Sequence, residues 1–553
     1  MERNEDRQLL SFLQRRGILG AADAERFERQ RKEHRISLRE YIVREGVIGE
    51  ENLLRDIAVE LGIPFVDLAH TEIAKDVISL VPVRYAAHYG VMPMGVKNDR
   101  LVLASSSPFD TLAADDISAF TDMDTQTVIS TQEEIERAIS RYYGLGAAAV
   151  DRLVKENDLP LPGASSSSTD DKSLIAGLVT TLVREALSVG ATDIHLEPSD
   201  ETLRIRFRID GMLKDVSLPE SITRLRPYLI SRVKIMAGLD IAEKRLPQDG
   251  RIQMHVDGQD VDIRVSTMPL VENEGVHLRL LRQKEFLDLE ALGCMPQTLE
   301  SLERVIRKPN GIILVTGPTG NGKSTTLYAC LDRINKEDIK IITVEDPVEY
   351  RLPGVNQIQV RSKIGLTFAE GLRNILRHDP DVLMVGEIRD SETADMAVRS
   401  ALTGHLVFST LHTNDAPSAI ARLTDMGVEP FLIASSLECV LAQRLVRKLC
   451  VHCRKKVIVS EEDHALGVKA DWYYSPAGCD RCGGSGYKGR TAIFEVMVMD
   501  DDIRVMVLRR ASSQEVRKQA IKNGMRTLTD DGLDKVSAGL TSVAEIMRVI
   551  KEE

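Results

Sequence analysis

The segment GPTGNGKST at residues 317–325 has the residue types and spacing to hold the phosphates of a nucleotide. It fits the pattern GxxxxGK[ST] and follows the apolar run GIILVT, which predicts a buried strand leading into the loop. Glycines let backbone N–H groups curl around the β-phosphate, and the start of the next helix favours its negative charge. We expect Lys323 to reach the β- and γ-phosphates and the Ser324 hydroxyl to bind Mg²⁺. The strand and helix on either side disfavour the alternative, a glycine-rich turn with no ligand. The predicted nucleotide-binding residues are Gly317, Pro318, Thr319, Gly320, Asn321, Gly322, Lys323, Ser324 and Thr325.

Acidic and histidine side chains flank further apolar runs that predict strands. Glu387 follows the run in DPDVLMVGEIRD, and Glu345 and Asp346 end the run in IITVEDPVEY. The segment TGHLVFSTLHTNDA places His405 before an apolar run and His412 after it. Alone, each is more simply a solvated acid or a structural histidine. Parallel sheets, however, bind ligands at the carboxyl ends of their strands. We therefore expect Glu387 to hold the magnesium shell or orient the attacking water, and His412 to sense the γ-phosphate.

Two CxxC pairs, CVHC and CDRC, predict a zinc site with four thiolate ligands. A site with all four positions filled by protein leaves none for a substrate, so this zinc is expected to be structural. Four unrelated buried thiols are the alternative, which the regular pairing disfavours. The predicted zinc ligands are Cys450, Cys453, Cys479 and Cys482. The unpaired Cys294, Cys330 and Cys439 are predicted to be core residues.

Composition excludes several classes of protein. The formal net charge of -12 argues against general affinity for nucleic acid, which rests on an excess of Lys and Arg. No apolar stretch is long enough to span a membrane, and the start MERNEDRQLL lacks the apolar core of a signal peptide. We therefore expect a cytoplasmic protein, with any membrane association made through partners or a surface patch.

The elements that must position these residues fall into successive segments. Residues 1–62 carry a weak repeat, RRGILG and REGVIG, each after an apolar helical stretch, which predicts a two-part helical module. Residues 63–143 alternate short strands and helices, and residues 144–173 are rich in Gly, Ser and Pro and predict a flexible linker. Residues 174–289 predict an α+β domain. Residues 290–553 predict a mostly parallel α/β core with the zinc subdomain at 445–490.

The α+β domain is predicted to present arginines on one face of its sheet. In LRIRFRIDGML, Leu, Ile and Phe alternate with Arg204, Arg206 and Arg208, and Asp-Gly supplies the turn. RIQMHVDGQDVDIRVSTM repeats this design with Arg264 on the polar side, and the strand GVHLRLL carries Arg279. Alternation alone predicts only that such a face is exposed to solvent.

Together these motifs closely resemble the secretion ATPases that drive type II secretion and type IV pilus assembly, the GspE/PilB family. The resemblance covers nearly the whole chain after the linker. It includes DIHLEP, RFRIDG, LPQDGRI, DIRVSTMP, the phosphate loop, VEDPVEY, DPDVLMVGEIRD, GHLVFSTLHTNDA and the tetracysteine stretch. The chain is slightly more similar to the type II secretion branch than to the pilus branch, through GLRNILRHDPDV and DMGVEPFLIASSL.

The resemblance implies a RecA-like P-loop ATPase core preceded by an α+β, PAS-like domain and by small N-terminal helical and α/β domains. It implies a cytoplasmic homohexamer that uses ATP, Mg²⁺ and zinc and works with platform proteins at the inner membrane. Glu345 would be the general base and Glu387 the Walker B acid. Arg208, Arg264 and Arg279 would act as arginine fingers that offset transition-state charge.

The N-terminal module resembles a tandem module that binds cyclic di-GMP in some family members. Here the halves lack the usual Arg-Leu-Gly opening, and Glu60 stands where a second Gln accompanying Gln30 is expected. These departures argue against cyclic di-GMP binding and favour docking to a membrane-bound adaptor.

Alternatives to type II secretion stay open at the sequence level. The pilus assembly motor has the same chemistry, whereas a regulatory nucleotide-binding module or a DNA translocase is disfavoured by the intact catalytic motifs and the acidic balance. A basic cluster beside the zinc site is predicted either to touch anionic lipid or to be a solvated face. This cluster comprises Arg444, Arg447, Lys448, Arg454, Lys455 and Lys456.

Overall fold

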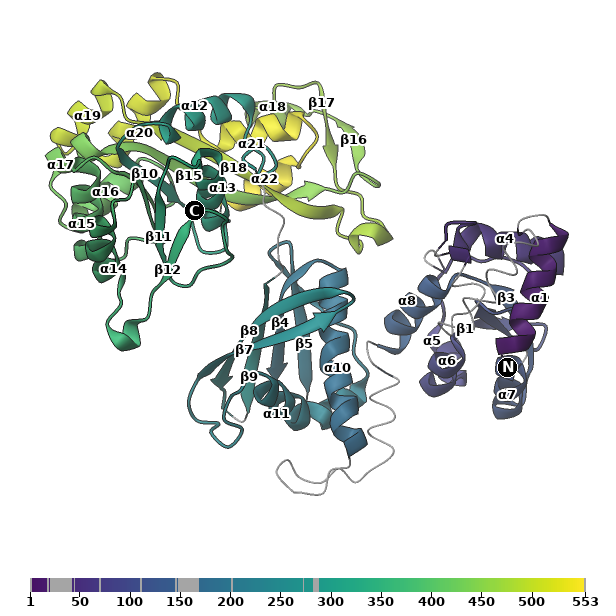
Figure 1. Cartoon of the computed structure of the whole chain (residues 1–553). Helices are drawn as coiled ribbons and strands as arrows, with labels where there is room; N and C mark the ends of the chain where they lie inside the picture. Colours follow the sequence, from purple (N-terminus) through teal and green to yellow (C-terminus); the bar gives the residue numbers. More distant parts are fainter. Residues whose placement is uncertain are drawn as a thin grey trace. The chain divides into compact units, whose positions relative to one another are not determined.

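The computed structural model describes residues 2–16, 19, 42–43, 45–68, 71–109, 112–144, 147, 169–199, 202–271, 273–281 and 288–551. The chain divides into two compact units, Met1–Arg282 and Gln283–Glu553 (Figure 1). Within these described ranges, no helix combines the length and the apolar character needed to cross a bilayer.

The N-terminal module contains two described helices, α1 (Glu2–Arg15) and α4 (Glu50–Leu61). Phe12 and Leu13 of α1 pack with Leu53 and Ile57 of α4 in one small core. Glu60 pairs with the guanidinium groups of Arg15 at 4.0 Å and Arg16 at 3.6 Å. Residues 20–41, which lie between the two parts of the predicted repeat and include Gln30, are outside the described residues, as is most of the predicted linker.

Residues 63–143 form a small α/β domain around a three-stranded sheet. The strands are β1 (Val91–Lys97), β2 (Arg100–Ser105) and β3 (Asp124–Ile129). β2 pairs with β1 antiparallel and with β3 parallel. The helices are α5 (Lys75–Leu80), α6 (Val83–Tyr89), α7 (Leu112–Thr121) and α8 (Gln132–Tyr143). Thr131 caps α8 by accepting a hydrogen bond from the N–H of Glu134.

The second part of this unit is an antiparallel sheet of six strands covered by helices α10 (Thr169–Ser188) and α11 (Arg226–Met236). The sheet order is β6-β5-β4-β9-β8-β7. The strands are β4 (Ala191–Pro198), β5 (Leu203–Ile209), β6 (Met212–Asp215), β7 (Gln248–Val256), β8 (Gln259–Pro269) and β9 (Glu274–Leu281). A short 3₁₀ helix, η1 (Glu220–Leu225), precedes α11.

Both predicted hairpins of this sheet are confirmed. Asp210-Gly211 joins β5 to β6 and Asp257-Gly258 joins β7 to β8, and all four residues have φ between 49° and 88°. Two consecutive left-handed residues form the turn type whose twist matches paired strands. Leu203, Ile205 and Phe207 of β5 are buried as predicted and Ile209 is half-buried, so the arginines between them face the other side of the sheet.

The C-terminal unit is built on a seven-stranded sheet ordered β12-β11-β13-β14-β10-β15-β18. Every neighbouring pair is parallel except β15 and β18, which are antiparallel. The strands are β10 (Gly311–Thr316), β11 (Ile341–Glu345), β12 (Asn356–Gln359), β13 (Val382–Val385), β14 (Leu406–Leu411), β15 (Leu437–Leu449) and β18 (Tyr487–Val498). The mostly parallel core expected from the sequence is confirmed.

Both faces of this sheet are buried, because residues along each central strand alternate between two cores. Leu314 of β10 packs in one core and Ile313 and Val315 pack in the other. The first face is covered by α14 (Phe368–Ile375), α15 (Ser391–Leu402), α16 (Ser418–Asp425), α17 (Pro430–Ser436), α19 (Asp501–Leu508) and α20 (Ser513–Lys522). The second is covered by α12 (Pro296–Ile306) and α13 (Lys323–Ile334) (Figure 1).

The end of the chain packs against the long β15–β18 hairpin. Helices α21 (Leu528–Ser537) and α22 (Val543–Lys551) form a further small core with Val446 of β15 and Ile493 of β18. The subdomain that was predicted to bind zinc is inserted between β15 and β18. It contains the hairpin of β16 (Lys455–Ile458) and β17 (Trp472–Ser475) and the short helix α18 (Glu461–Ala465).

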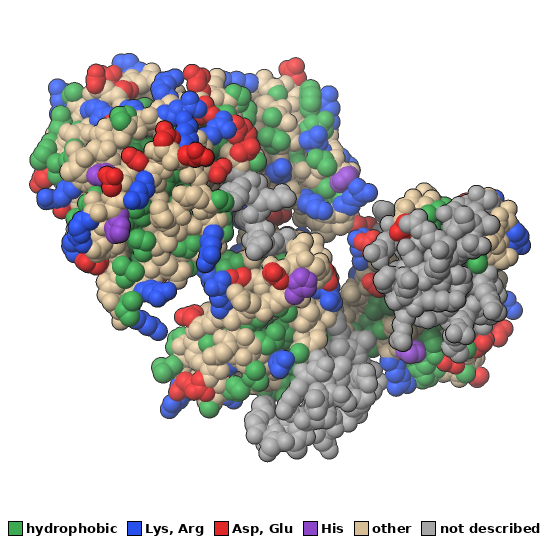
Figure 2. All heavy atoms as spheres, in the orientation of Figure 1, with side chains coloured by type: hydrophobic (Ala, Val, Ile, Leu, Met, Phe, Trp, Pro, Cys, Tyr) green, Lys and Arg blue, Asp and Glu red, His purple; other side chains and the backbone are tan. Residues whose placement is uncertain are grey.

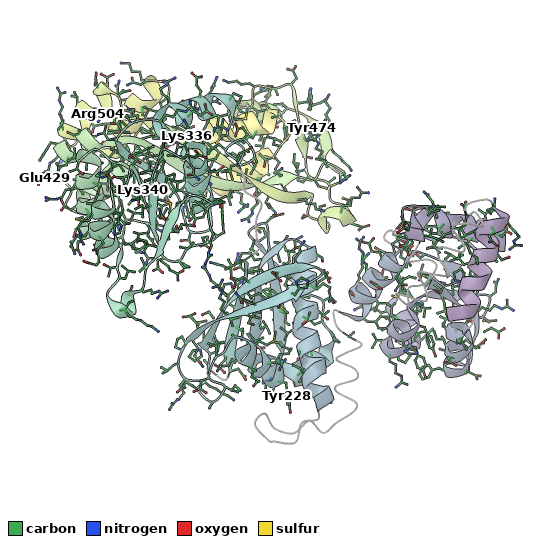
Figure 3. The ribbon with its side chains drawn as sticks, viewed as in Figure 1. Tyr228, Lys336, Lys340, Glu429, Tyr474 and Arg504 are labelled. Atoms are coloured by element: carbon green, nitrogen blue, oxygen red, sulfur yellow. The ribbon has the colours of Figure 1, made fainter. Side chains whose placement is uncertain are left out.

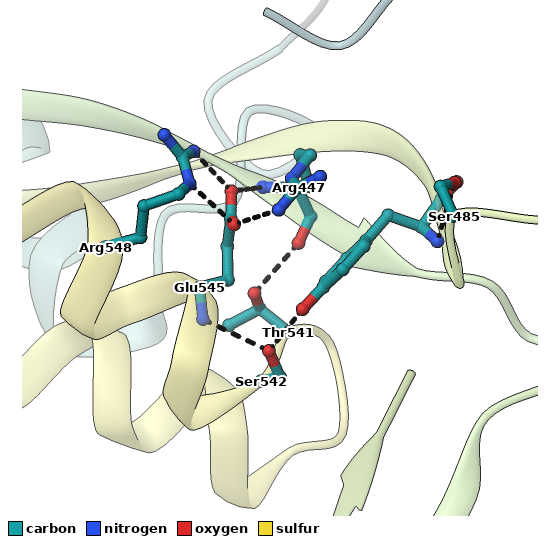
Figure 4. A network of polar contacts seen from close by, with 7 residues as sticks. Arg447, Ser485, Thr541, Ser542, Glu545 and Arg548 are labelled. Atoms are coloured by element: carbon teal, nitrogen blue, oxygen red, sulfur yellow. Dashed lines mark hydrogen bonds and ion pairs between the residues drawn. The ribbon is translucent and has the colours of Figure 1, made fainter. Parts of the chain in front are cut away.

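The predicted basic cluster does not form one surface. Arg444 is buried, and Arg447 is bound to the buried carboxylate of Glu545, which also binds Arg548 (Figure 4). These two guanidinium groups hold the pKa of Glu545 at about 2 although burial opposes that shift.

Arg454, another residue of the predicted cluster, stacks on Tyr474, which Figure 3 labels on the tetracysteine subdomain. The cluster prediction is wrong for Arg444, because β15 carries it into the interior. Arg447 is only partly exposed, and the exposed lysines of the predicted cluster are Lys448, Lys455 and Lys456.

We expect Lys535→Met to lower the stability of the C-terminal unit. Nζ of this fully buried lysine donates to the Asp531 carboxylate at 2.5 Å and to the Ala492 carbonyl at 2.6 Å. Removing it leaves a buried carboxylate without its cation, which costs about 3–5 kcal/mol. Urea unfolding monitored by circular dichroism measures the change. The exposed Lys522→Met is the control, with an expected change of at most about 0.5 kcal/mol. Equal shifts for the two variants would contradict a stabilising role for the buried pair.

Candidate functional site

The predicted catalytic residues of the C-terminal unit are placed by the carboxyl ends of four parallel strands. Thr316 at the end of β10 pairs with Leu411 at the end of β14, directly before Gly317 and His412. β13 lies between β14 and β11, and Glu387 and Glu345 come from the ends of these two strands. Because parallel strands end at one edge, residues from distant segments meet there.

The phosphate loop connects β10 to the start of α13, the context that the mechanism requires. Gly317 must be glycine, because a Cβ there would lie 2.5 Å from the Gln443 carbonyl oxygen. Gly320 and Gly322 have φ of 81° and 78°, which side chains adopt at a cost. The loop therefore needs its glycines for backbone conformation and for close packing.

Lys323 lies buried at the first turn of α13. Its Nζ donates to the carbonyl oxygens of Gly317 at 2.7 Å and Pro318 at 3.1 Å, so the side chain folds back over the loop. Burial, with a smaller contribution from the nearby Arg444 charge, lowers the pKa of Lys323 to about 8, while Glu387 opposes the shift. A bound polyphosphate would favour the charged form, which makes this lysine a strong anion ligand.

Hydrogen bonds from strand β15 hold the phosphate loop in place. The Asn321 side chain accepts a hydrogen bond from the Leu445 N–H at 2.9 Å, and the Gln443 side chain donates to the Asn321 carbonyl at 2.8 Å. Gln443 also accepts a hydrogen bond from the Thr326 hydroxyl of α13 at 2.6 Å. The phosphate cradle is made of backbone groups and does not require the Asn321 side chain. This side chain instead fixes the loop against β15.

Glu345 is a buried carboxylate held by three donors. It accepts hydrogen bonds from the Thr343 hydroxyl at 2.6 Å, from the Gln357 amide at 3.1 Å and from the Tyr328 hydroxyl. Burial raises the pKa of Glu345 despite these hydrogen bonds. Tyr328 belongs to α13, so this contact links the helix that follows the phosphate loop to the end of β11.

Glu387 sits in a different electrostatic environment. Its carboxylate pairs with Arg389 at 2.5 Å and lies 3.3 Å from Nε2 of His412. Burial alone would raise the pKa of Glu387, but Arg389 and His412 outweigh that effect and hold it below its usual range. The structure therefore brings Glu387 and His412 into contact, and the electrostatic influence of Glu387 reaches Lys323.

His405 does not belong to this group. It precedes β14, whose first residue Leu406 pairs with Gly311 at the start of β10, and its Nδ1 bonds the Ser400 carbonyl at 2.9 Å. The two histidines of the same motif thus lie at opposite ends of one strand. Ser324, the predicted magnesium ligand, follows Lys323 with an exposed side chain.

The predicted arginine fingers stand on the sheet of the other unit. Arg279 of β9 binds the buried carboxylate of Asp193 at 3.0 Å, and the same carboxylate bonds Nε2 of His277 at 2.8 Å. Hydrogen bonds from these partners outweigh burial and hold the pKa of Asp193 far below its usual range. Arg208 donates to the Gly211 carbonyl at 2.8 Å, and Arg264 is half-buried opposite Arg279 on the neighbouring strand.

The four cysteines of the two CxxC pairs come together, with all four sulfur atoms within 4.8 Å of one another. Sγ–Sγ distances are 3.9 Å for Cys450–Cys479, 3.9 Å for Cys453–Cys482 and 3.8 Å for Cys479–Cys482. Tetrahedral zinc with Zn–S bonds of about 2.3 Å needs sulfur atoms about 3.8 Å apart, so the donor set fits. Cys294, Cys330 and Cys439 lie in the core instead, as predicted.

Sequence reasoning missed three residues of this site: Tyr328, Gln443 and Arg444. Gln443 and Arg444 interrupt the apolar run of LECVLAQRLVRKL, and polar residues inside a buried strand are the signal that could have revealed them. The Arg444 guanidinium lies 3.5 Å from the position of a Cβ on Gly317 and donates to the Asn414 carbonyl and side chain. It therefore belongs to the nucleotide site rather than to a surface cluster.

Family models match most of the chain. A model described as type II/IV secretion system protein matches residues 168–548, and one described as the MshEN domain matches residues 61–149. The second match follows the segment that carries RRGILG and REGVIG rather than overlying it.

Individual relatives and structures agree with these matches. The type II secretion system protein E of Xanthomonas campestris is 40% identical over 572 residues, covering 100% of both chains. The type IV pilus assembly ATPase PilB of Myxococcus xanthus is 38% identical over 553 residues, covering 97% of both. The ATPase DotB of Legionella pneumophila has a similar fold, with a TM-score of 0.50 at 21% identity over 71% of this chain and 98% of its own. The predicted fold class is confirmed.

We expect Lys323→Ala to abolish ATP hydrolysis, because the phosphate loop loses the ammonium group that would bind the β- and γ-phosphates. Phosphate release with Mg²⁺ present measures the loss. Asn321→Ser is the matched control in the same loop and should keep most of the activity, since a serine oxygen can still accept a hydrogen bond from the Leu445 N–H. Turnover by Lys323→Ala within twofold of wild type would refute the phosphate-loop assignment.

We expect about one zinc per chain in protein purified under reducing conditions, as a four-thiolate site requires. Cys450→Ser should lose the metal and loosen residues 445–490 while ATP still binds, because the phosphate loop does not use this subdomain. Cys294→Ser, whose sulfur lies outside the cluster, should keep its zinc. Metal analysis measures the stoichiometry, and freshly prepared protein free of zinc would overturn the assignment.

Proposed function

Since this chain belongs to the type II/IV secretion system protein family and is an ATPase, we propose that it converts ATP hydrolysis into the mechanical work of type II protein secretion, by driving pseudopilus assembly. The observation that carries the proposal is the convergence of the phosphate loop, Glu345 and Glu387 at one edge of the sheet. A non-hydrolysing nucleotide-binding module would have no need for two carboxylates with oppositely shifted pKa values at that edge.

The two carboxylates divide the chemistry between them. A lowered pKa keeps Glu387 ionised at neutral pH, which suits a residue that holds the magnesium shell together with Ser324. The raised pKa of Glu345 makes it a better base than an ordinary glutamate, which suits abstraction of a proton from the attacking water. Environments that push two carboxylates apart in pKa are the usual basis of such a division.

The positive charge needed in the transition state would come from several groups. Lys323 supplies one charge from the phosphate loop, and His412 is proposed to sense the γ-phosphate beside Glu387. We propose Arg208, Arg264 and Arg279 as arginine fingers that act in the assembled homohexamer. Asp193 holds Arg279 in one orientation, so little side-chain entropy is lost when the guanidinium meets an anion.

Association with the inner membrane is proposed to use partners rather than a membrane-spanning segment. The N-terminal module would dock to a membrane-bound adaptor, and the platform proteins of the secretion system would receive the mechanical stroke. The exposed Lys448, Lys455 and Lys456 remain candidates for contact with anionic lipid heads. Figure 2 shows basic and acidic side chains interspersed over the visible face of the C-terminal unit, which does not resemble a nucleic-acid-binding surface.

Type IV pilus assembly is the second candidate function. It is favoured by the relative named PilB that matches 97% of this chain, whereas a relative named for type II secretion matches 100%. Both machines would use the same site.

Deleting the gene should stop the release of exoproteins into the medium and leave surface pili in place. Wild-type protein should restore release, while Glu387→Gln should bind ATP, hydrolyse it slowly and fail to restore release. Exoprotein activity in the medium and electron microscopy of pili are the measurements. Loss of pili with normal exoprotein release would show the pilus function instead, and loss of neither would refute both.

A further inference from the structure

The five residues His412–Ala416, here called the His loop, follow β14 and are tied residue by residue to five different elements. His412 bonds Glu387 after β13, and the Thr413 N–H donates to the Thr316 hydroxyl of β10 at 2.8 Å. Asn414 accepts from Arg444 of β15. The remaining two residues reach β18 and α20, which carry none of the predicted catalytic motifs.

The contacts of those last two residues converge on Arg517 of α20. Its Nη1 donates to Oδ2 of Asp415 at 3.0 Å, and its Nη2 lies 3.9 Å from Oε2 of Glu495 on β18. Oε1 of Glu495 accepts from the Ala416 N–H at 2.9 Å. The guanidinium group thus lies between two carboxylates, one on the loop and one beneath it.

Loss of the Arg517 contact would be costly because the carboxylate of Glu495 is buried. Its side chain is fully buried, and no hydrogen bond to its Oε2 is found in the described part of the chain. Burial raises the pKa of Glu495; the Ala416 N–H and the Arg517 charge oppose that shift, and the Asp415 charge adds to it. Without Arg517, two carboxylates would face each other with no cation between them, one of them out of reach of water. The end of the His loop would then be pushed away from β18.

Helix α20 is a firm support for the arginine. Val516 and Ala520 are buried in the same core as α16 and the central strands, and Ser512 and Glu515 form a capping box at its start. Arg517 therefore lies on a helix that is packed against the sheet. Because the helix is held in place, the contacts of Arg517 can restrain the His loop.

We propose that Arg517 is a positioning residue for ATP hydrolysis, which fixes the His loop through Asp415 and Glu495 and so holds His412 against Glu387. The inference rests on the proposed role of Glu387 in hydrolysis. The phosphate loop keeps its own contacts to Gln443 and Leu445 without Arg517. Nucleotide binding therefore does not depend on the contacts between Arg517 and the two carboxylates.

The test compares kcat and KM for ATP in the full-length protein. Arg517→Gln lowers kcat about tenfold while KM stays within about twofold, because a small displacement of an aligned group slows chemistry more than binding. Arg517→Lys, which keeps a charge at the site, recovers part of kcat. Lys518→Gln, an exposed neighbour on the same helix, keeps wild-type kcat. Melting temperature and light scattering confirm that the variants compared are folded and equally assembled.

Asp415→Asn provides an independent arm. It keeps the Oδ1 acceptor for the Ser418 N–H at 2.8 Å and loses the negative charge that Arg517 contacts. If Arg517 acts through Asp415, the double variant is no slower than the slower single variant. Should Arg517→Gln fail to fold, the decision passes to Asp415→Asn, in which the same kcat loss at constant KM supports the proposal and unchanged kcat overturns it.

Two further outcomes overturn the proposal: wild-type kcat in folded Arg517→Gln, or losses in the double variant that multiply as independent effects. Glu387→Gln is assayed in parallel to separate the two claims. If it hydrolyses ATP at the wild-type rate, the proposed role of Glu387 fails. If it is inactive while Arg517→Gln is fully active, only the positioning role of Arg517 fails.

Discussion

Parallel pairing of β10, β14, β13 and β11 is the constraint on which the active edge depends. Strands in register end together, so residues separated by up to about a hundred positions along the chain emerge side by side. The pairing of Thr316 with Leu411 alone sets the phosphate loop beside the His loop. A shift of one residue in this register would turn every side chain of the shifted strand to the opposite face of the sheet. The two cores that cover the sheet, one on each face, make such a shift costly.

Several charged side chains are buried next to this edge of the sheet. Lys323, Glu345, Arg444 and Glu495 are all less than a tenth exposed, and desolvation is the largest influence on the pKa of the first two and of Glu495. Burying charges opposes folding unless partners compensate. Here backbone groups and neutral hydroxyl and amide side chains supply most of that compensation, and Arg517 adds a positive charge near Glu495. Such an arrangement costs stability but supplies oriented charge in a region of low dielectric, which is what binding and hydrolysis of a polyanion need.

The end of the chain completes the core rather than extending it. α21 and α22 close over β15 and β18 through polar contacts. The Lys535 ammonium of α21 donates to the Ala492 carbonyl of β18, and the Glu545 carboxylate of α22 binds Arg447 of β15. The tetracysteine cluster organises a subdomain with few buried apolar residues, where metal ligation can replace a hydrophobic core. β15 connects both regions to the phosphate loop, because Gln443 and Arg444 belong to the same strand as Arg447 and lead into Cys450.

Elements with a local signal could be predicted from the amino-acid sequence. GxxxxGK[ST] predicted the loop and helix around Lys323, the CxxC pairs predicted the cluster, and Asp-Gly with alternating apolar residues predicted both hairpins. Which distant residues share an environment followed only from the way the strands and helices pack together. His405 and His412 lie at opposite ends of β14. Arg444, expected in a surface cluster, lies near the phosphate loop, and Arg517 of α20 contacts the His loop. The reason is that local patterns fix strand and turn identity, whereas strand order and helix packing, which set long-range contacts, leave no periodic trace in the chain.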